Sequence, residues 1–261
     1  RRTARAERGS ALGYEPPEAL KRPGGARWRD QLYGTTFEPV AIIYNKNALA
    51  ASEVPHTRAA LAALLLREPE RFAGKVMSYD IEKSGVGFLL ASQDADADPA
   101  FWDLAQALGK ARLRFALTTD AMVRRVARGD ALLAYNVLGA YALNQAARDP
   151  TLGVVLPSDY TLVLSRLMFI NKKATHPNAA RLWLDYLLSQ RGQSLLAGRS
   201  HLYAVRSDVG GDHTAAALRQ RLGQSLRPIP IGAGLTRHAS GEAYRDFVQR
   251  WRGSLGGGAP R

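Results

Sequence analysis

Residues 75–90, KVMSYDIEKSGVGFLL, place the strongest constraint on the fold of this chain. A short strand-like run is followed by a polar turn, and two glycines then flank Val86 at the start of an apolar segment. A strand, a small-residue turn and a helix start together form a site where backbone N–H groups point outward at a ligand. This stretch therefore predicts a pocket for a polar or anionic ligand on an α/β lobe.

Strand-like and helix-like stretches alternate along the rest of the chain. Runs of β-branched and aromatic residues predict strands over 35–44, 75–79, 113–117, 131–138, 152–156 and 160–170. Apolar residues at helical spacing predict helices over 58–66, 99–108, 120–128, 140–147, 177–187, 192–197, 214–222 and 241–251. Residues 28–33 are predicted to form a short helix that packs Trp28. Short strands alternating with helices indicate an α/β fold.

Several of these helices carry recognisable start signals. Thr57 is the expected N-cap of the helix that begins at Arg58, and Thr119 is the expected N-cap of the helix that begins at Asp120. Pro177, which follows His176, occupies a first-turn position where proline is favoured.

The composition excludes several classes of protein. At 261 residues, of which 46% are hydrophobic, the chain can bury one large core or two smaller ones. It has no cysteine, so disulfides, cysteine-ligated zinc and thiol nucleophiles are excluded. No apolar run approaches the roughly 20 residues of a spanning helix. The arginine-rich start lacks an apolar segment behind it, so we expect no signal peptide within this chain.

The formal charge of +13 does not by itself indicate a nucleic-acid partner. Residues 1–29 hold eight Arg and Lys against three Glu, and residues 1–27 are expected to be poorly ordered. Elsewhere the arginines are scattered over predicted helices, without the aromatic residues that interleave a basic stripe at a nucleic-acid site. We therefore expect a solvated basic surface, which would also attract an anionic solute.

Signatures of catalysis and of cofactor binding are missing from the sequence. It contains no G-x-S-x-G elbow, no H-E-x-x-H, no Walker A motif and no G-x-G-x-x-G. The five histidines show no metal-ligand spacing. We expect no enzymatic activity, no metal and no cofactor.

The first group of candidate ligand-binding residues lies in the stretch described above. The Ser84 hydroxyl and the N–H groups of Gly85, Val86 and Gly87 suit a carboxylate or phosphate-like oxygen at a helix start. The alternative is that Ser84 only caps its own helix. Tyr79, at the end of the strand, either donates a hydrogen bond to the solute or packs.

The second group lies elsewhere in the chain. Tyr135 and Asn136 end the strand 131–138, and the carboxyl ends of strands border the ligand crevice in open α/β sheets. Asn136 either contacts the solute or satisfies neighbouring backbone groups. Asp159 and Tyr160 lie directly before residues 161–170 and could close the floor of the ligand crevice, although Asp159 would disfavour an anion unless it is paired. Glu38 either meets an amine or is solvated.

Five segments resemble a known family when they are taken in order over about residues 33–206. They are TTFEPVAIIYNK, GKVMSYDIEKSGVGFLLASQD, ARGDALLAYNVLGAYAL, GVVLPSDYTLVLSR and HPNAARLWLDYLLSQRGQSLLA. This set resembles the solute-binding proteins of bacterial ABC importers with the type II periplasmic-binding fold, in the branch that includes ferric-iron, polyamine and phosphonate binders. HPNAARLWLDYLLSQRGQ resembles a recurrent helix pair of that family most closely.

The resemblance implies two α/β lobes with mixed sheets, joined by two crossing strands. Residues 36–44 would be the first crossing and residues 161–170 the return. Residues 28–44 and 161–252 would form the first lobe and residues 45–160 the second, with a disordered tail over 253–261. About two βα units would precede Trp28 in such proteins, so we expect the first lobe to be incomplete.

The resemblance also implies a function. A monomeric periplasmic protein would capture a small polar or anionic solute in the cleft between the lobes and deliver it to a membrane permease, without a nucleic-acid partner. The alternatives are a ligand-sensing regulatory domain of the same fold and a truncated remnant that does not bind. Ferric binders of the family supply adjacent tyrosines, whereas Tyr135 and Tyr141 are separated here, so we predict no ferric site.

Overall fold

The computed structural model describes residues 9–17 and 26–257, and the chain divides into two compact units. The first unit is Arg1–Glu38 with Val163–Ala239, and the second is Pro39–Leu162 with Ser240–Arg261. The chain passes from one unit to the other within strand β3 (Glu38–Asn45), within strand β8 (Thr161–Leu164) and before the last helix. The sequence-based expectation had crossings at residues 36–44 and 161–170 and none before the last helix.

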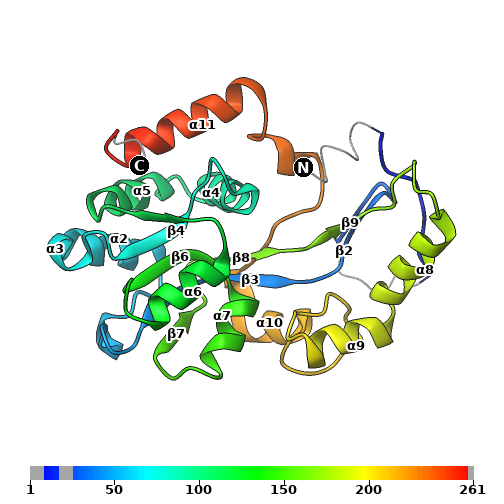
Figure 1. Cartoon of the computed structure of the whole chain (residues 1–261), viewed down its shortest axis with the longest axis horizontal. Helices are drawn as coiled ribbons and strands as arrows, with labels where there is room; N and C mark the ends of the chain where they lie inside the picture. Colours follow the sequence, from blue (N-terminus) through cyan, green and yellow to red (C-terminus); the bar gives the residue numbers. More distant parts are fainter. Residues whose placement is uncertain (1–8, 18–25, 258–261) are drawn as a thin grey trace. The chain divides into compact units, whose positions relative to one another are not determined.

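The second unit is built on a mixed sheet, as the sequence predicted (Figure 1). Strand β4 (Val76–Tyr79) pairs in parallel with β5 (Arg114–Ala116) and with β6 (Leu133–Leu138). β3 pairs antiparallel with β6 and with β7 (Leu152–Val155). The parallel strands each lead into a helix, so β4, β5 and β6 place three helix starts at the same edge of the sheet.

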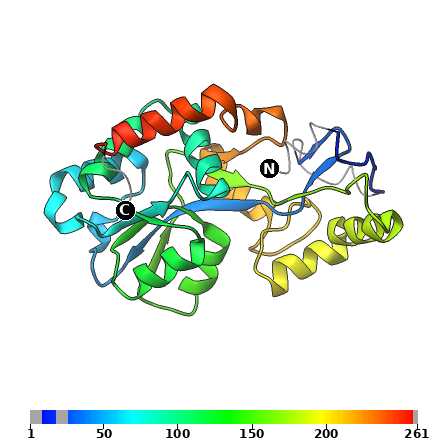
Figure 2. The ribbon, with the colours of Figure 1, turned by 45° about the horizontal axis from the view of Figure 1, so that its top comes forward.

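Helices cover both faces of this sheet. α6 (Thr119–Ala127) and α7 (Gly139–Ala146) lie on the face opposite to α4 (Gly85–Ala97) and α5 (Phe101–Lys110) (Figures 1 and 2). The other face forms the main core of the unit, in which Phe101, Leu104, Ala105 and Leu108 are buried at the predicted helical spacing. The helices of this face are α2 (Arg58–Arg67), α3 (Pro69–Phe72), α4 (Gly85–Ala97), α5 (Phe101–Lys110) and α11 (Gly241–Ser254).

The last helix, α11, belongs to the second unit, whereas the sequence assigned it to the first lobe. Its aromatic residues explain this placement. Phe247 packs against Phe88 and Trp102, with ring centroids 5.3 Å apart in both pairs, and Trp251 stacks on Phe101 at 5.9 Å. After the helix, Leu255 lies against Gly109, within the segment predicted to be disordered, and residues 258–261 lie outside the described part.

Within residues 9–17, 26–38 and 163–239, the first unit contains a small antiparallel sheet and the helices α8 (Pro177–Leu188), α9 (Gln190–Arg199) and α10 (Ala215–Leu222). The sheet consists of β1 (Arg27–Trp28), β2 (Leu32–Gly34) and β9 (Leu167–Met168). A buried cluster joins Tyr33 and Ile170 to Leu184 and Leu188 of the first of the helices. The unit also contains β10 (Leu226–Pro228).

Part of the N-terminal segment that the sequence predicted to be poorly ordered packs into the first unit. Ala11 is fully buried and forms a bridge with Asn171, and the Tyr14 hydroxyl donates to the Asp185 carboxylate at 2.6 Å. The rest of the prediction concerns residues 1–8 and 18–25, which lie outside the described residues.

Two secondary-structure predictions in the first unit were wrong. Residues 28–33 form a hairpin instead of a helix, because Arg29 and Asp30 adopt φ of 51° and 45° in a tight turn. The predicted long strand 160–170 is divided into β8 and β9. The interruption at Arg166 lets its guanidinium pair with the buried carboxylate of Glu38 at 2.5 Å.

The placement of α11 leads to a prediction about stability. Trp251→Ala should lower the free energy of unfolding by about 3–5 kcal/mol, because it removes a buried aromatic side chain from a packed core. Trp183→Ala on α8 is the control, since Trp183 is 54% exposed and should change stability much less. Urea unfolding followed by circular dichroism measures both variants, and equal losses would contradict the packing described.

Candidate functional site

A cavity of about 380 Å³ lies in the second unit where β4, β5 and β6 end. Three helices start around it, namely α4, α6 and α7. Its lining residues are Tyr79, Ser84, Val86, Leu117, Thr118, Thr119, Asp120, Leu138 and Tyr141. Three residues of the first predicted group, Tyr79, Ser84 and Val86, are therefore brought together at one cavity.

The start of α4 is organised by its own turn. The Asp80 carboxylate accepts hydrogen bonds from the N–H groups of Glu82 and Lys83 at 3.0 and 3.2 Å. The Ser84 hydroxyl accepts from the Gly87 N–H at 3.1 Å, so Ser84 caps the helix and also lines the cavity. A helix leaves its first N–H groups without intrahelical acceptors, which makes those of Gly85 and Val86 potential donors to a ligand.

Gly87 has a packing role. A Cβ at this position would lie 2.3 Å from the Cβ of Tyr79, which real structures do not tolerate. The glycine therefore allows the first turn of α4 to lie directly against the end of β4. Its N–H donates to Ser84, so the structure gives Gly87 a partner within the protein in place of the ligand contact predicted for it.

The start of α6 forms another part of the cavity wall. Thr118 is its N-cap, since its hydroxyl accepts from the Ala121 N–H at 3.2 Å. The sequence predicted Thr119 for this role. Thr119 instead forms a hydrogen bond with the Tyr79 hydroxyl at 2.5 Å, which joins β4 to α6. The Asp120 carboxylate is exposed and pairs with Arg124 at 2.5 Å.

Most of the lining that β5, β6, α6 and α7 contribute was not predicted from the sequence. Thr118 and Leu138 each end a strand and precede a helix, and this repeated strand-to-helix transition was the available signal. Tyr141, in the first turn of α7, is partly exposed and was considered only as a possible iron ligand.

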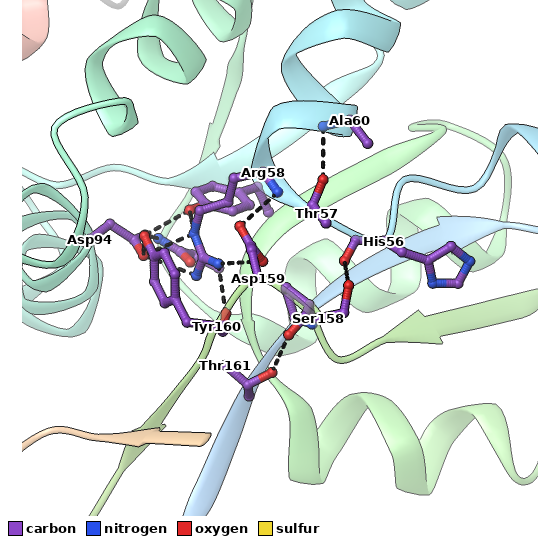
Figure 3. Close-up of polar contacts among 12 residues, drawn as sticks. His56, Thr57, Arg58, Ala60, Asp94, Ser158, Asp159, Tyr160 and Thr161 are labelled. Carbon is purple, nitrogen blue, oxygen red and sulfur yellow. Dashed lines mark hydrogen bonds and ion pairs between the residues drawn. The ribbon is translucent and has the colours of Figure 1, made fainter. Parts of the chain in front are cut away.

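Four predicted residues lie in a separate, largely buried network around Arg58, namely Tyr135, Asn136, Asp159 and Tyr160. Figure 3 labels Arg58, Asp94, Asp159 and Tyr160 of this network. The Arg58 guanidinium pairs with Asp94 at 3.0 Å and with Asp159 at 3.2 Å. The Tyr135 and Tyr160 hydroxyls donate to Asp94 at 2.7 and 3.0 Å. None of these side chains lines the cavity at the helix starts, so their placement gives no support to ligand binding by Tyr135, Asp159 or Tyr160.

The network shifts the pKa values of the Arg58 guanidinium and of the two phenols in the direction that keeps them protonated. Burial alone would lower the pKa of Arg58, but the surrounding Tyr135 and Asp94 outweigh it and raise this pKa above its ordinary value. Burial raises the pKa of Tyr135, and burial together with Asp94 raises the pKa of Tyr160. Both phenols therefore remain protonated and continue to donate to Asp94 at neutral pH.

Asn136 joins the same network through a bulge. The φ of Asn136, 60°, lies in the left-handed region. At this point along β6, the pairing with β3 shifts register between Ala41 and Ile43. The shift breaks the alternation of side chains along β6, so the side chains of Tyr135 and Asn136 both reach Asp94. The Asn136 amide donates to Asp94 at 2.7 Å, and its Oδ1 atom is buried without a partner among the described residues.

Glu38 lies in the first unit and is 1% exposed. Its carboxylate accepts hydrogen bonds from the Thr36 hydroxyl at 2.8 Å and from Arg166. The charge is therefore neutralised within the protein, and the burial of the side chain contradicts the predicted alternative of solvation. Contact of Glu38 with an amine stays a prediction.

Within residues 9–17 and 26–257, no group of three or more His, Asp or Glu side chains is placed to hold a metal ion. Among the same residues, no helix combines the length and the apolar character needed to cross a lipid bilayer.

Comparison with known proteins places this geometry in context. Residues 16–229 match the family model described as bacterial extracellular solute-binding protein. The structure is similar to that of the substrate-binding protein of an ABC transporter from Agrobacterium tumefaciens, with 34% identity, a TM-score of 0.90, and coverage of 97% of this chain and 75% of that one. A comparison with curated proteins found no match.

Two more distant structures share the fold. The periplasmic binding protein AfuA from Actinobacillus pleuropneumoniae, solved with fructose-6-phosphate, has a TM-score of 0.74 and 15% identity over 96% of this chain and 78% of that one. Iron-bound HitA from Pseudomonas aeruginosa has a TM-score of 0.70 and 18% identity over 97% and 78%. The sequence-based expectation of a type II periplasmic-binding fold is confirmed.

The buried network leads to a second prediction. Asp94→Asn should lower the free energy of unfolding by about 3–5 kcal/mol, because it leaves Arg58 with an uncompensated part of its charge in the protein interior. Asp120→Asn is the matched control, since Asp120 also pairs with an arginine but at the exposed surface. Urea unfolding at pH 7 measures both, and a similar small loss in each would show that the network does not hold the unit together.

Proposed function

The chain belongs to the bacterial extracellular solute-binding protein family, and from that premise we propose that it binds a small anionic solute in the cavity where α4 and α6 begin. The observation that carries the proposal is the meeting of three helix starts around one cavity of about 380 Å³. This volume suits a small molecule. The partial positive charge at each helix N-terminus favours a negatively charged group.

The hydrogen bonds already made inside the protein favour an anion over an amine. The hydroxyls of Ser84 and Thr118 already accept hydrogen bonds from their own helices, and those of Tyr79 and Thr119 bond each other. A bound solute would therefore contact mainly backbone N–H groups at the helix starts. The one carboxylate of the lining, Asp120, is paired with Arg124. Such a site suits carboxylate or phosphate oxygens, which accept hydrogen bonds without needing to donate.

The remaining parts of the proposal concern what the protein does with the solute. It binds and releases the solute without chemical change, in the periplasm, and delivers it to the permease of an ABC importer. The similarity to the Agrobacterium tumefaciens protein, which is described as the substrate-binding protein of such a transporter, supports this. The absence of a ferric site stays a prediction, supported by the engagement of the Tyr135 hydroxyl with Asp94 and Arg58.

A thermal-shift screen tests the solute class. Carboxylates, sugar phosphates, phosphonates and inorganic phosphate should include a compound that raises the Tm, whereas polyamines should not, because binding to the folded state alone stabilises it. Amino acids and ferric citrate complete the panel. A polyamine as the strongest stabiliser would contradict the anionic assignment.

Variants at Val86 then test the location. Val86 lies in the first turn of α4 at the cavity wall, where an acidic residue does not disturb the helix. Val86→Glu should weaken binding of the anionic solute by about tenfold or more, measured by isothermal titration calorimetry. Val86→Gln is the matched control, with nearly the same size and no charge, and it should weaken binding far less. Equal affinities in the two variants would place the anion elsewhere.

A further inference from the structure

Strand β5 ends the strand order of the second unit, and among residues 9–17 and 26–257 no strand pairs with its outer edge. A cavity of about 650 Å³ adjoins β5. Residues 113–118 all line it, and Asp80, Lys83, Ala121 and Arg125 complete the wall. The cavity meets the solute cavity only at Leu117 and Thr118, so it is a separate feature that the proposed function does not use.

The ladder of β5 shows which backbone groups remain on the outer edge. The Ala116 carbonyl accepts from the Asp80 N–H at 2.9 Å, so Ala116 faces the β4 side. The N–H and C=O of one strand residue point to the same side, and successive residues point to opposite sides. The N–H and the C=O of Phe115 therefore both point to the outer edge of β5, and so does the N–H of Leu117. An added strand could take up these groups.

The surroundings of this edge are basic. Arg114 on the strand and Arg125 on α6 line the cavity, and neither guanidinium has an acidic partner among the described residues. The third cation, Lys83, lies 3.3 Å from Asp80, the only acidic residue of the lining. Leu117 adds an apolar contact, since it is 59% exposed. Backbone donors and acceptors, two unneutralised cations and an exposed leucine thus border one cavity.

We propose that the outer edge of β5 is a docking site for an extended, acidic segment of a partner protein, which adds as a further strand. Charge complementarity selects the acidic segment, and backbone hydrogen bonds to Phe115 hold it. The five residues 113–117 span roughly 13 Å, enough for a segment of about five residues. Shortness and charge also protect strand edges from pairing. Other protected edges are covered by a helix or loop or distorted by a bulge. The outer edge of β5 instead borders a cavity, which leaves room for an added strand.

A fluorescein-labelled peptide that alternates valine and aspartate over seven residues is the probe, and fluorescence anisotropy with the full chain is the measurement. Saturable binding is expected, and it should weaken as salt is added because the attraction is screened. Arg114→Glu and Arg125→Glu should each weaken binding by about tenfold. Arg148→Glu is the matched control, since it makes the same charge change at an exposed position outside the cavity and should leave binding nearly unchanged.

A second peptide separates strand addition from simple charge attraction. The same sequence is made with N-methyl groups on either the odd-numbered or the even-numbered residues, so that each peptide keeps every charge but loses the N–H groups along one edge. For the peptide that is methylated on the edge facing β5, the affinity should fall to that of the parent peptide for the Arg114→Glu variant. Binding of both N-methylated peptides as tight as that of the parent would overturn the proposal. So would equal loss in Arg148→Glu, full displacement of the peptide by equimolar citrate, or no saturable binding by the parent peptide.

Discussion

The ion pair between Arg58 and Asp94 is the interaction on which the second unit depends. It is almost completely buried, and it joins the first residue of α2 to the last turns of α4. Tyr135 from β6 and Tyr160 from the segment before β8 complete the shell around the carboxylate. Two charges in a protein interior are tolerated only when such hydrogen bonds satisfy them. The network therefore fixes the relative positions of α2, α4, β6 and the segment before β8.

The same interaction bears on the candidate site through α4. Asp94 holds the helix near its end, and the close contact between Gly87 and Tyr79 holds it at its start. A helix fixed at both ends presents its first N–H groups in a constant direction. The hydrogen bond between Tyr79 and Thr119 then links the start of α6 to the same strand. A rigid arrangement of donors at the cavity follows, and rigidity lowers the entropic cost of binding a solute.

Sequence patterns predicted what depends on local chemistry. Thr57 caps α2 as expected, Pro177 opens α8, and the strand-turn-helix around Ser84 forms at the predicted residues. These signals act within a few residues, so they can be recognised without the tertiary structure. Tyr79, Ser84 and Val86 were found at the cavity for the same reason.

Features that depend on distant contacts could not be predicted. The left-handed conformation of Asn136 arises from a bulge between two strands, and it redirects two side chains that a regular strand would have placed on opposite faces. The position of α11 depends on aromatic packing with residues more than a hundred positions earlier. The hairpin turn at Arg29 and Asp30 could not be predicted, because it lacks the asparagine and glycine that are the usual sequence signal of such a turn.

Amide chemical-shift mapping tests whether an anionic solute binds where α4 and α6 begin. The ¹⁵N-labelled protein is titrated with the anionic compound that raises the Tm most, and ¹H–¹⁵N correlation spectra are recorded. We expect the largest shifts at the N–H groups of Gly85, Val86, Thr119 and Asp120, at the starts of α4 and α6. Shifts confined to other parts of the chain, with these four amides unchanged, would contradict binding at this site.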